Sequence, residues 1–122
     1  MRVLLVEDSR ARHAEYRRSL EAAGYEVLSA YDGTEVAELI TAASPAIIVS
    51  DTDLPALDGD QALRPLFEAG RLNDTLVIGM SSARHYEEHW RGLAYEFRHK
   101  GGITDLGETV TAIHRRFRSA AR

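Results

Sequence analysis

Short runs of apolar residues alternate along the chain with longer segments in which apolar residues recur every three or four positions. Runs rich in β-branched residues are typical of strands, and the three-to-four spacing is typical of amphipathic helices. The predicted strands span residues 2–6, 25–30, 47–50, 76–80 and 95–100. The predicted helices span residues 9–23, 32–44 and 61–69, with a helical stretch around 86–90 and a last helix across 106–117. This alternation predicts an α/β fold with a doubly wound parallel sheet, and the length of 122 residues predicts one domain spanning residues 1–122.

Residues with strong capping or backbone preferences set the predicted helix ends. Ser9 is a good N-cap for the first helix, and Gly24 is a good stop signal after it. Ser44 and Pro45 are expected to end the second helix, because proline disfavours helical backbone before it. Pro65 lies inside the third helical pattern, where its ring would clash with the preceding turn. We therefore expect Pro65 to delay the start of that helix or to kink it.

Two predicted strands end in acidic residues. Glu7 and Asp8 follow the first strand, and Asp51 ends the third, which is apolar enough to be buried on both faces. Taken alone, Asp51 is more typical of a turn or a helix cap. If the two strands are neighbours, however, the three carboxylates converge, and they repel one another unless a cation lies between them. Oxygen ligands with room for water suit Mg²⁺, so the pattern predicts a magnesium site at Glu7, Asp8 and Asp51.

Two further polar residues follow predicted strands. Lys100 closes the fifth strand and is the only lysine among the 15 lysine and arginine residues. A compact ammonium at that edge of the sheet could contact an anionic ligand, although chance also accounts for a single lysine. Ser81 follows the fourth strand, where serine is common, so it carries weight only as part of a pattern.

Taken together, these residues resemble the receiver domain of two-component response regulators, in particular the chemotaxis-regulator-like ones. The matching motifs are Glu7-Asp8, Asp51 followed by Leu54-Pro55 and Asp58-Gly59, Ser81, and Lys100. The resemblance covers essentially the whole chain and implies a five-stranded sheet in the flavodoxin-like order 2-1-3-4-5, with helices on both faces. Because no effector domain follows Arg122, we expect a stand-alone receiver that acts through protein contacts, unless the chain is a fragment of a longer protein.

The resemblance assigns roles to the residues at this edge. Asp51 would be the phosphoacceptor that attacks a phosphohistidine or a small acyl phosphate. Mg²⁺ would be held by Glu7, Asp8 and Asp51, and by the backbone carbonyl of Asp53. Lys100 would contact the phosphoryl group. The protein would then be a self-phosphoacceptor with possible autodephosphorylation, and not an enzyme acting on a separate substrate.

The resemblance also implies a switch and partners. Ser81 would move toward the phosphoryl group while Phe97, the aromatic residue of strand five, turns inward, although Phe97 is equally explained as a core residue. The face formed by helix four, strand five and helix five would signal to an unknown downstream protein. The phosphoryl donor would be a histidine kinase or a histidine phosphotransfer protein.

The sequence departs from the family pattern at two places. Receivers usually have proline after the lysine, whereas here Lys100 precedes Gly101 and Gly102. We expect a trans peptide and a looser loop, because a cis bond before a non-proline residue costs ~2.5 to 4 kcal/mol. The interval from Ser81 to Lys100 is shorter than usual by about one helical turn, so helix four is expected to be stunted or irregular. The positions of Asp53 and Ala83 tune dephosphorylation in the family.

Two alternative functions stand beside the receiver, and two other motifs fit poorly. A pseudo-receiver would keep the fold and bind proteins without phosphate. The triplet at residues 51–53 resembles the D-x-D motif of haloacid-dehalogenase-type phosphatases, which follows the first strand and needs a longer chain. His85 and His89, with Glu88 between them, fit an inverted zincin pattern, for which no third ligand is evident. The acidic residues that begin at Asp51 do not form an EF-hand loop, because the glutamate that closes such a loop is missing.

Composition narrows the choice of partners. The net charge of −4 gives no basic footprint for nucleic acid, and the arginines at residues 114–118 are more typical of a solvated helix face. The absence of cysteine and of any long apolar run fits a cytoplasmic protein that does not enter a membrane. Trp90 either pins the short fourth helix to the core or anchors a partner, and the core is the more typical place for it.

Overall fold

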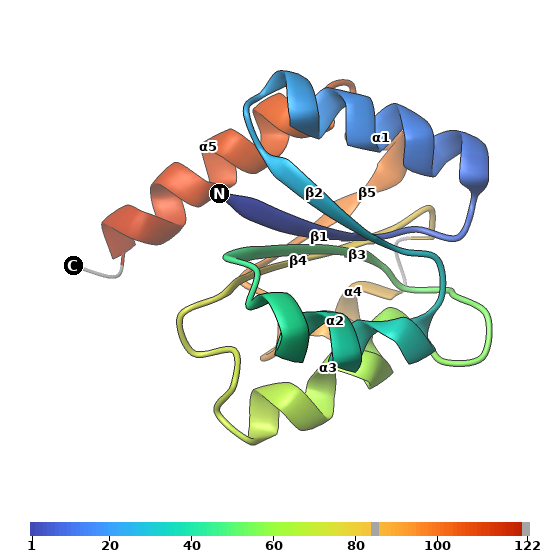
Figure 1. Ribbon diagram of the computed structural model, residues 1–122, viewed down its shortest axis with the longest axis vertical. Coiled ribbons are helices and arrows are strands. Elements are labelled where there is room, and N and C mark those ends of the chain that lie inside the picture. The colour runs from blue at the N-terminus through green and yellow to red at the C-terminus, as the bar shows by residue number, and fades with distance from the viewer. Residues whose placement is uncertain (84–85, 121–122) are drawn as a thin grey trace.

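Five strands form one parallel sheet (Figure 1). The computed structural model describes residues 1–83 and 86–120. The strands are β1 (Arg2–Val6), β2 (Glu26–Ala30), β3 (Ile47–Asp51), β4 (Leu76–Ser81) and β5 (Glu96–His99). Their order is β2-β1-β3-β4-β5, and every neighbouring pair is parallel. The predicted α/β fold and its flavodoxin-like strand order are confirmed, with β1 beside β3.

Helices cover both faces of this sheet (Figure 1). One face carries α1 (Arg10–Ala22) and α5 (Leu106–Ala120). The other face carries α2 (Val36–Ala43), α3 (Gly59–Glu68) and α4 (Glu87–Trp90). In the described chain, the 3-10 turn η1 (Gly33–Glu35) precedes α2, and the 3-10 turn η3 (Lys100–Gly102) follows β5. No helix among the described residues is both long and apolar enough to cross a membrane.

Each face of the sheet has its own apolar core. Leu20 of α1 and Ile113 of α5 pack on one side, while Val36 of α2, Leu63 of α3 and Trp90 of α4 pack on the other. All five residues of β3 are buried, which explains why its first three residues, Ile47–Val49, are apolar without alternation. The central strands are therefore fixed from both sides, and so are the residues at their carboxyl ends.

The capping signals set most helix ends as predicted. The Ser9 hydroxyl accepts a hydrogen bond from the Arg12 N–H and caps α1. Ser44 closes α2 in the left-handed conformation, with φ of 45°.

The start of α3 differs from the prediction. The helix begins at Gly59, because Asp58 caps it and the Gln61 side chain accepts the Asp58 N–H at 3.4 Å. Pro65 lies inside the helix and does not delay its start. Capping at the first turn therefore sets the N-terminal end of α3. Pro65 has no N–H, so it removes one backbone hydrogen bond inside the helix.

The fourth helix is short, as predicted, with only four residues. It is attached through Trp90, whose side chain is 1% exposed, so the core interpretation of this residue is confirmed. The indole lies directly on Gly79 of β4, where an added Cβ would meet its Cδ2 atom at 2.4 Å. His85 lies outside the described residues. No peptide bond in the described chain is cis, which agrees with the trans Lys100–Gly101 bond that we expected.

Candidate functional site

The carboxyl ends of β1 and β3 bring three carboxylates together. Val6 of β1 pairs with Ser50 of β3, so the residues that come next, Glu7 and Asp51, lie at the same edge. Glu7 is fully buried, Asp51 is 5% exposed, and Asp8 is exposed. Candidate ligand oxygens of these three residues all lie within 4.8 Å of one another. Convergence of the three carboxylates, which the sequence predicted on condition that the strands are neighbours, is therefore observed.

Lys100 joins the cluster from η3, after the end of β5. Its Nζ donates to Glu7 Oε1 at 2.7 Å and to Asp51 Oδ2 at 2.8 Å, and its side chain is 7% exposed. Such buried charge-assisted hydrogen bonds are short and strong. One ammonium faces three carboxylates, so the cluster keeps an excess of negative charge.

Backbone donors satisfy the remaining oxygens of the two buried acids. The Thr52 N–H donates to Asp51 Oδ1 at 2.9 Å, and the Ser9 N–H donates to Glu7 Oε2 at 3.0 Å. Gly59 allows the start of α3 to approach this point, because a Cβ there would lie 2.1 Å from the Asp51 carbonyl oxygen. Both carboxylates are thus held in fixed orientations.

Burial governs the acid–base properties of the cluster. Desolvation raises the pKa of Asp51 to about 6, against the lowering effect of Lys100. Burial also pushes the pKa of Lys100 down, but its hydrogen bonds to Asp51 and Glu7 outweigh this effect, so that pKa lies above its ordinary value. At neutral pH the cluster therefore holds an ionised Asp51 beside a firmly protonated Lys100.

The donor set fits a hard divalent cation. Carboxylate oxygens are the ligands that Mg²⁺ prefers, and few protein ligands leave room for the waters that it keeps. Asp8 is exposed and can supply an oxygen from the solvent side, while Glu7 and Asp51 face it from inside. The cluster is thus an acidic pocket compatible with Mg²⁺ and with phosphorylation of an aspartate.

The structure also describes three other predicted site residues. Ser81 is buried at the end of β4, and its Oγ accepts the Ala83 N–H at 3.0 Å. Phe97 of β5 is half-buried and packs against the core on the α2–α4 side, which leaves both of its interpretations open. Asp53 is exposed in the loop after β3.

Sequence reasoning missed two residues at the site. His13 is 2% exposed, its Nδ1 lies 3.0 Å from the Glu7 carbonyl oxygen, and its ring stacks on Tyr31. Thr52 is fully buried, and its hydroxyl links Met80 to Trp90. A polar residue directly after a fully buried strand was the available signal for Thr52, whereas His13 gave none.

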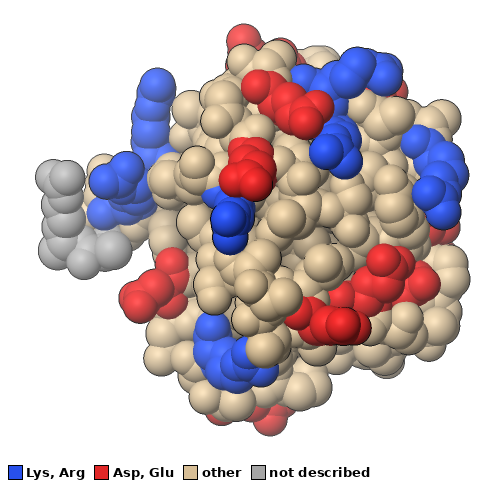
Figure 2. Space-filling view, in the orientation of Figure 1, with Lys and Arg blue, Asp and Glu red and all other residues tan. Residues whose placement is uncertain are grey.

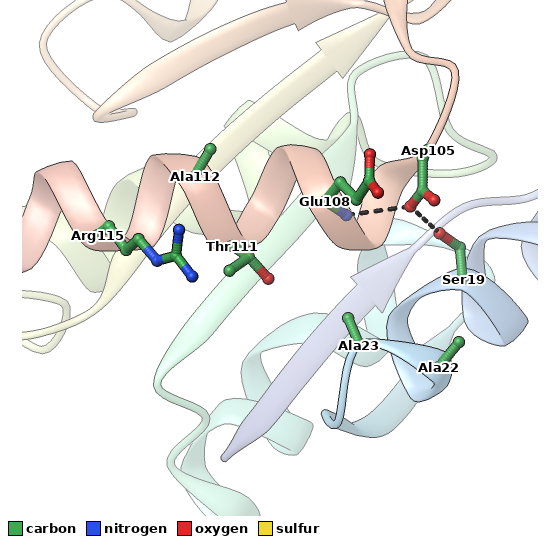
Figure 3. Close-up of a pocket in the computed structure, with 8 residues that line it drawn as sticks. All are labelled: Ser19, Ala22, Ala23, Asp105, Glu108, Thr111, Ala112 and Arg115. Atoms are coloured by element: carbon green, nitrogen blue, oxygen red, sulfur yellow. Dashed lines mark hydrogen bonds between the residues drawn. The ribbon is translucent and has the colours of Figure 1, made fainter.

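A separate surface pocket of about 480 Å³ lies between α1 and α5 (Figure 3). There the Ser19 hydroxyl donates to Asp105 Oδ1 at 2.8 Å, and Asp105 also accepts the Glu108 N–H as the helix cap. None of its lining residues belongs to the acidic cluster. These polar groups satisfy one another, so this pocket is a helix junction apart from the cluster.

The outer surface carries both signs of charge. On the face shown in Figure 2, basic and acidic side chains are interspersed. On α5, Arg116 pairs with Glu96 of β5 at 3.0 Å, and Arg115 and Arg118 are exposed. These arginines form the solvated helix face that their spacing suggested.

Comparison with known proteins identifies a matching family and several relatives. A family model described as the response regulator receiver domain matches residues 3–98. Response regulator MprA from Mycobacterium avium is 40% identical over 84 residues, which cover 69% of this chain and 36% of MprA. MprA from Mycobacterium leprae is also 40% identical over 84 residues, with the same coverage. The chain thus spans about a third of the length of these relatives.

Solved structures agree with the fold. The receiver domain of a Francisella response regulator superposes with a TM-score of 0.82 at 25% identity, covering 95% of this chain and 98% of that one. The response regulator TrrA of Thermotoga maritima, solved in complex with Mg²⁺ and BeF, gives a TM-score of 0.80 at 21% identity, covering 92% and 97%. The second likeness supports the fold alone.

Proposed function

This chain belongs to the response regulator receiver domains, and from that premise we propose that Asp51 is its phosphoacceptor. The observation that carries the proposal is the buried bridge from Lys100 to Asp51 and Glu7. The bridge supports the proposal because it orients one oxygen of Asp51 and holds an ammonium beside the carboxylate, where charge would develop during phosphoryl transfer. Receivers of this family take their phosphoryl group from histidine kinases, so the proposed donor is a histidine kinase or a histidine phosphotransfer protein.

The reaction needs a nucleophile and neutralisation of charge. An oxygen of ionised Asp51 attacks the phosphorus atom, the new O–P bond forms, and the bond from phosphorus to the leaving group breaks. The leaving group, an imidazole nitrogen or the acetate oxygen of acetyl phosphate, takes the bonding electron pair. Lys100 already contacts Asp51 Oδ2 and can donate to the transferred phosphoryl oxygens. Ser81, at the end of the neighbouring strand, is proposed as a further donor to the same group.

A divalent ion completes the proposed site. Asp8 and Asp51 would hold Mg²⁺, with Glu7 bound directly or through water and the Asp53 backbone carbonyl as a further ligand. When bound, Mg²⁺ supplies positive charge that neutralises the phosphoryl oxygens. The protein is proposed to act as a self-phosphoacceptor and not as an enzyme with a separate substrate, and to signal through the face of α4, β5 and α5.

Two rival functions make different predictions. A pseudo-receiver would bind proteins with no need of phosphate, whereas a small phosphatase would turn over a phosphate ester repeatedly. A fold alone does not establish a function, so the test that separates the three functions has to be chemical.

Intact-mass analysis after incubation with Mg²⁺ and acetyl phosphate tests the proposal. We expect one phosphoryl group on the wild type and none on Asp51→Asn. Asp58→Asn is the matched control, since this carboxylate caps α3 and should leave labelling intact. An unlabelled, folded wild type that also fails to bind beryllofluoride would favour the pseudo-receiver, and sustained ester hydrolysis would favour the phosphatase.

A further inference from the structure

The only tryptophan of the chain is hydrogen-bonded to the residue that follows Asp51. Trp90 Nε1 donates to Thr52 Oγ1 at 2.7 Å, and both residues are buried, at 1% and 0% exposure. The backbone N–H of the same Thr52 donates to Asp51 Oδ1 at 2.9 Å. A single residue therefore lies between the carboxylate of Asp51 and the short helix α4.

The Thr52 hydroxyl is also tied to β4. It donates to the carbonyl oxygen of Met80 at 2.8 Å. A hydroxyl has one proton, so this bond fixes its orientation and turns a lone pair toward Trp90. The β-branched side chain is stiff about χ1, so the hydroxyl moves only with its backbone. Met80 directly precedes Ser81, and a displacement at the end of β4 would therefore act on the same hydroxyl.

Trp90 also lies beside the position of the proposed switch aromatic. The indole packs on Gly79, and Gly79 pairs in register with Phe97 of β5. Trp90 and Phe97 line one surface pocket of about 230 Å³ between α4 and β5. Trp90 thus bonds to Thr52 and also lines a pocket that it shares with Phe97.

We propose that Trp90 is a positioning residue that transmits the state of Asp51 to α4 through the Thr52 hydroxyl. The inference rests on the proposed function. Phosphorylation changes the charge on the carboxylate that the Thr52 N–H contacts and draws Ser81 toward the phosphoryl group. Thr52 contacts Asp51 through its N–H and the residue before Ser81 through its hydroxyl. Both changes therefore act on the hydrogen bond between this hydroxyl and Trp90, and the packing of α4 changes with it.

Because α4 is short, its position can depend on the single hydrogen bond between Trp90 and Thr52. A helix of four residues has few attachments to the rest of the molecule. The Arg64 guanidinium donates to the His89 carbonyl at 3.1 Å, but this contact is exposed to solvent. The hydrogen bond to Thr52 is buried, so among these attachments it is the one that water cannot readily replace.

The indole N–H gives a direct readout, because one tryptophan gives one indole signal in a proton–nitrogen NMR spectrum. We expect this signal to shift when the wild type is loaded with Mg²⁺ and acetyl phosphate. In Thr52→Val, which keeps the shape and removes the hydroxyl, the response to phosphorylation should be lost. Thr52→Ser, which keeps the hydroxyl, should retain it and serves if the valine variant fails to fold.

Thr111→Val is the matched control. Its hydroxyl also has two partners, the Gly107 carbonyl and the Tyr25 hydroxyl, but it lies on the opposite face of the sheet. Its removal should leave the response of the indole signal unchanged. A tryptophan with a purely structural role would give a signal that ignores phosphorylation in every variant.

A second arm needs no phosphate and keeps the two proposals separable. Asp51→Asn neutralises the carboxylate and should shift the indole signal in the native background, but not in the Thr52→Val background. A phosphorylated wild type with an unmoved indole signal would overturn the inference and leave the proposed function standing. If intact mass shows no phosphoryl group, the proposed function fails, and the Asp51→Asn arm alone decides the inference: an unmoved signal there overturns it.

Discussion

Two halves of the same sheet edge are held together in different ways. At the ends of β1 and β3, the buried carboxylates of Glu7 and Asp51 are each paired with Lys100 and with a backbone N–H. At the end of β4, the described attachments of the short helix α4 are the buried packing of Trp90 on Gly79, the buried hydrogen bond from Trp90 to Thr52, and contacts that water can reach. The first half is a charge network and the second is mainly a packing contact.

The difference teaches where each half is vulnerable. Removing one member of a buried charge network leaves another charge unpaired, which costs several kcal/mol. Removing an exposed contact costs little, because water takes the place of the lost partner. Substitutions should therefore have large effects in the acidic cluster and at the tryptophan, and small effects on the outside of α4.

The largest effect is expected from Lys100→Met in the metal-free protein. It leaves Glu7 and Asp51 buried without a cation, so the free energy of unfolding should fall by about 3 kcal/mol near neutral pH. Urea unfolding in the absence of Mg²⁺ measures this. Lys100→Arg keeps the charge and should lose less. An unchanged unfolding midpoint for the methionine variant would mean that the bridge does not stabilise the fold.

Magnesium should have the next largest effect, and the effect should depend on pH. A ligand that binds only the folded state adds ~2.7 kcal/mol at a hundredfold excess over its dissociation constant. Burial raises the pKa of Asp51 to about 6, so the folded metal-free protein binds this proton more tightly than the unfolded chain does. The stability contribution of Asp51 therefore falls as pH rises from the ordinary value of 3.8 to about 6.

Mg²⁺ binds the ionised carboxylate, so its stabilisation should be larger at about pH 7.5 than at about pH 5. Thermal melts with and without Mg²⁺ at both pH values test this. Asp51→Asn should remove most of the pH dependence. A gain that is the same at both pH values in the wild type would contradict the assignment of Asp51 as a ligand.

Gly79→Ala tests the packing half of the comparison. The new Cβ would lie 2.4 Å from the Trp90 indole, and overpacking of this kind costs about 2 kcal/mol. Gly102→Ala is the matched control, since a Cβ there meets nothing within 4 Å, and its effect should stay within about 0.5 kcal/mol. Equal unfolding free energies for the two variants in urea would show that the indole can move aside freely.

The acidic half of the site was largely predictable from the sequence. Apolar runs that end in Glu7, Asp8 and Asp51 predict that these carboxylates converge, because parallel strands present their carboxyl ends at one edge of the sheet. The isolated Lys100 was also visible as the only lysine. The strand order itself came from the family resemblance, since alternation of strands and helices alone permits several orders.

The packing half was not predictable in the same way. The contact between Trp90 and Thr52 joins residues 38 positions apart, and the sequence around either residue does not indicate that the other is its partner. The early start of α3 was missed because the capping pair of Asp58 and Gln61 outweighs the presence of Pro65 in the helix. Hydrogen bonds between distant residues depend on side-chain geometry, which the spacing of apolar residues along the sequence does not predict.

The smallest effect is expected from His89→Gln on the outside of α4. His89 Nδ1 lies 3.6 Å from Asp60 Oδ2, and the histidine side chain is 45% exposed, so this contact should contribute no more than about 0.5 kcal/mol to the unfolding free energy. Urea unfolding beside the wild type measures the difference. A loss as large as that of Gly79→Ala would show that α4 is held from outside. A loss within the expected limit would place its attachment in the buried tryptophan, because the two contacts belong to adjacent residues of one short helix.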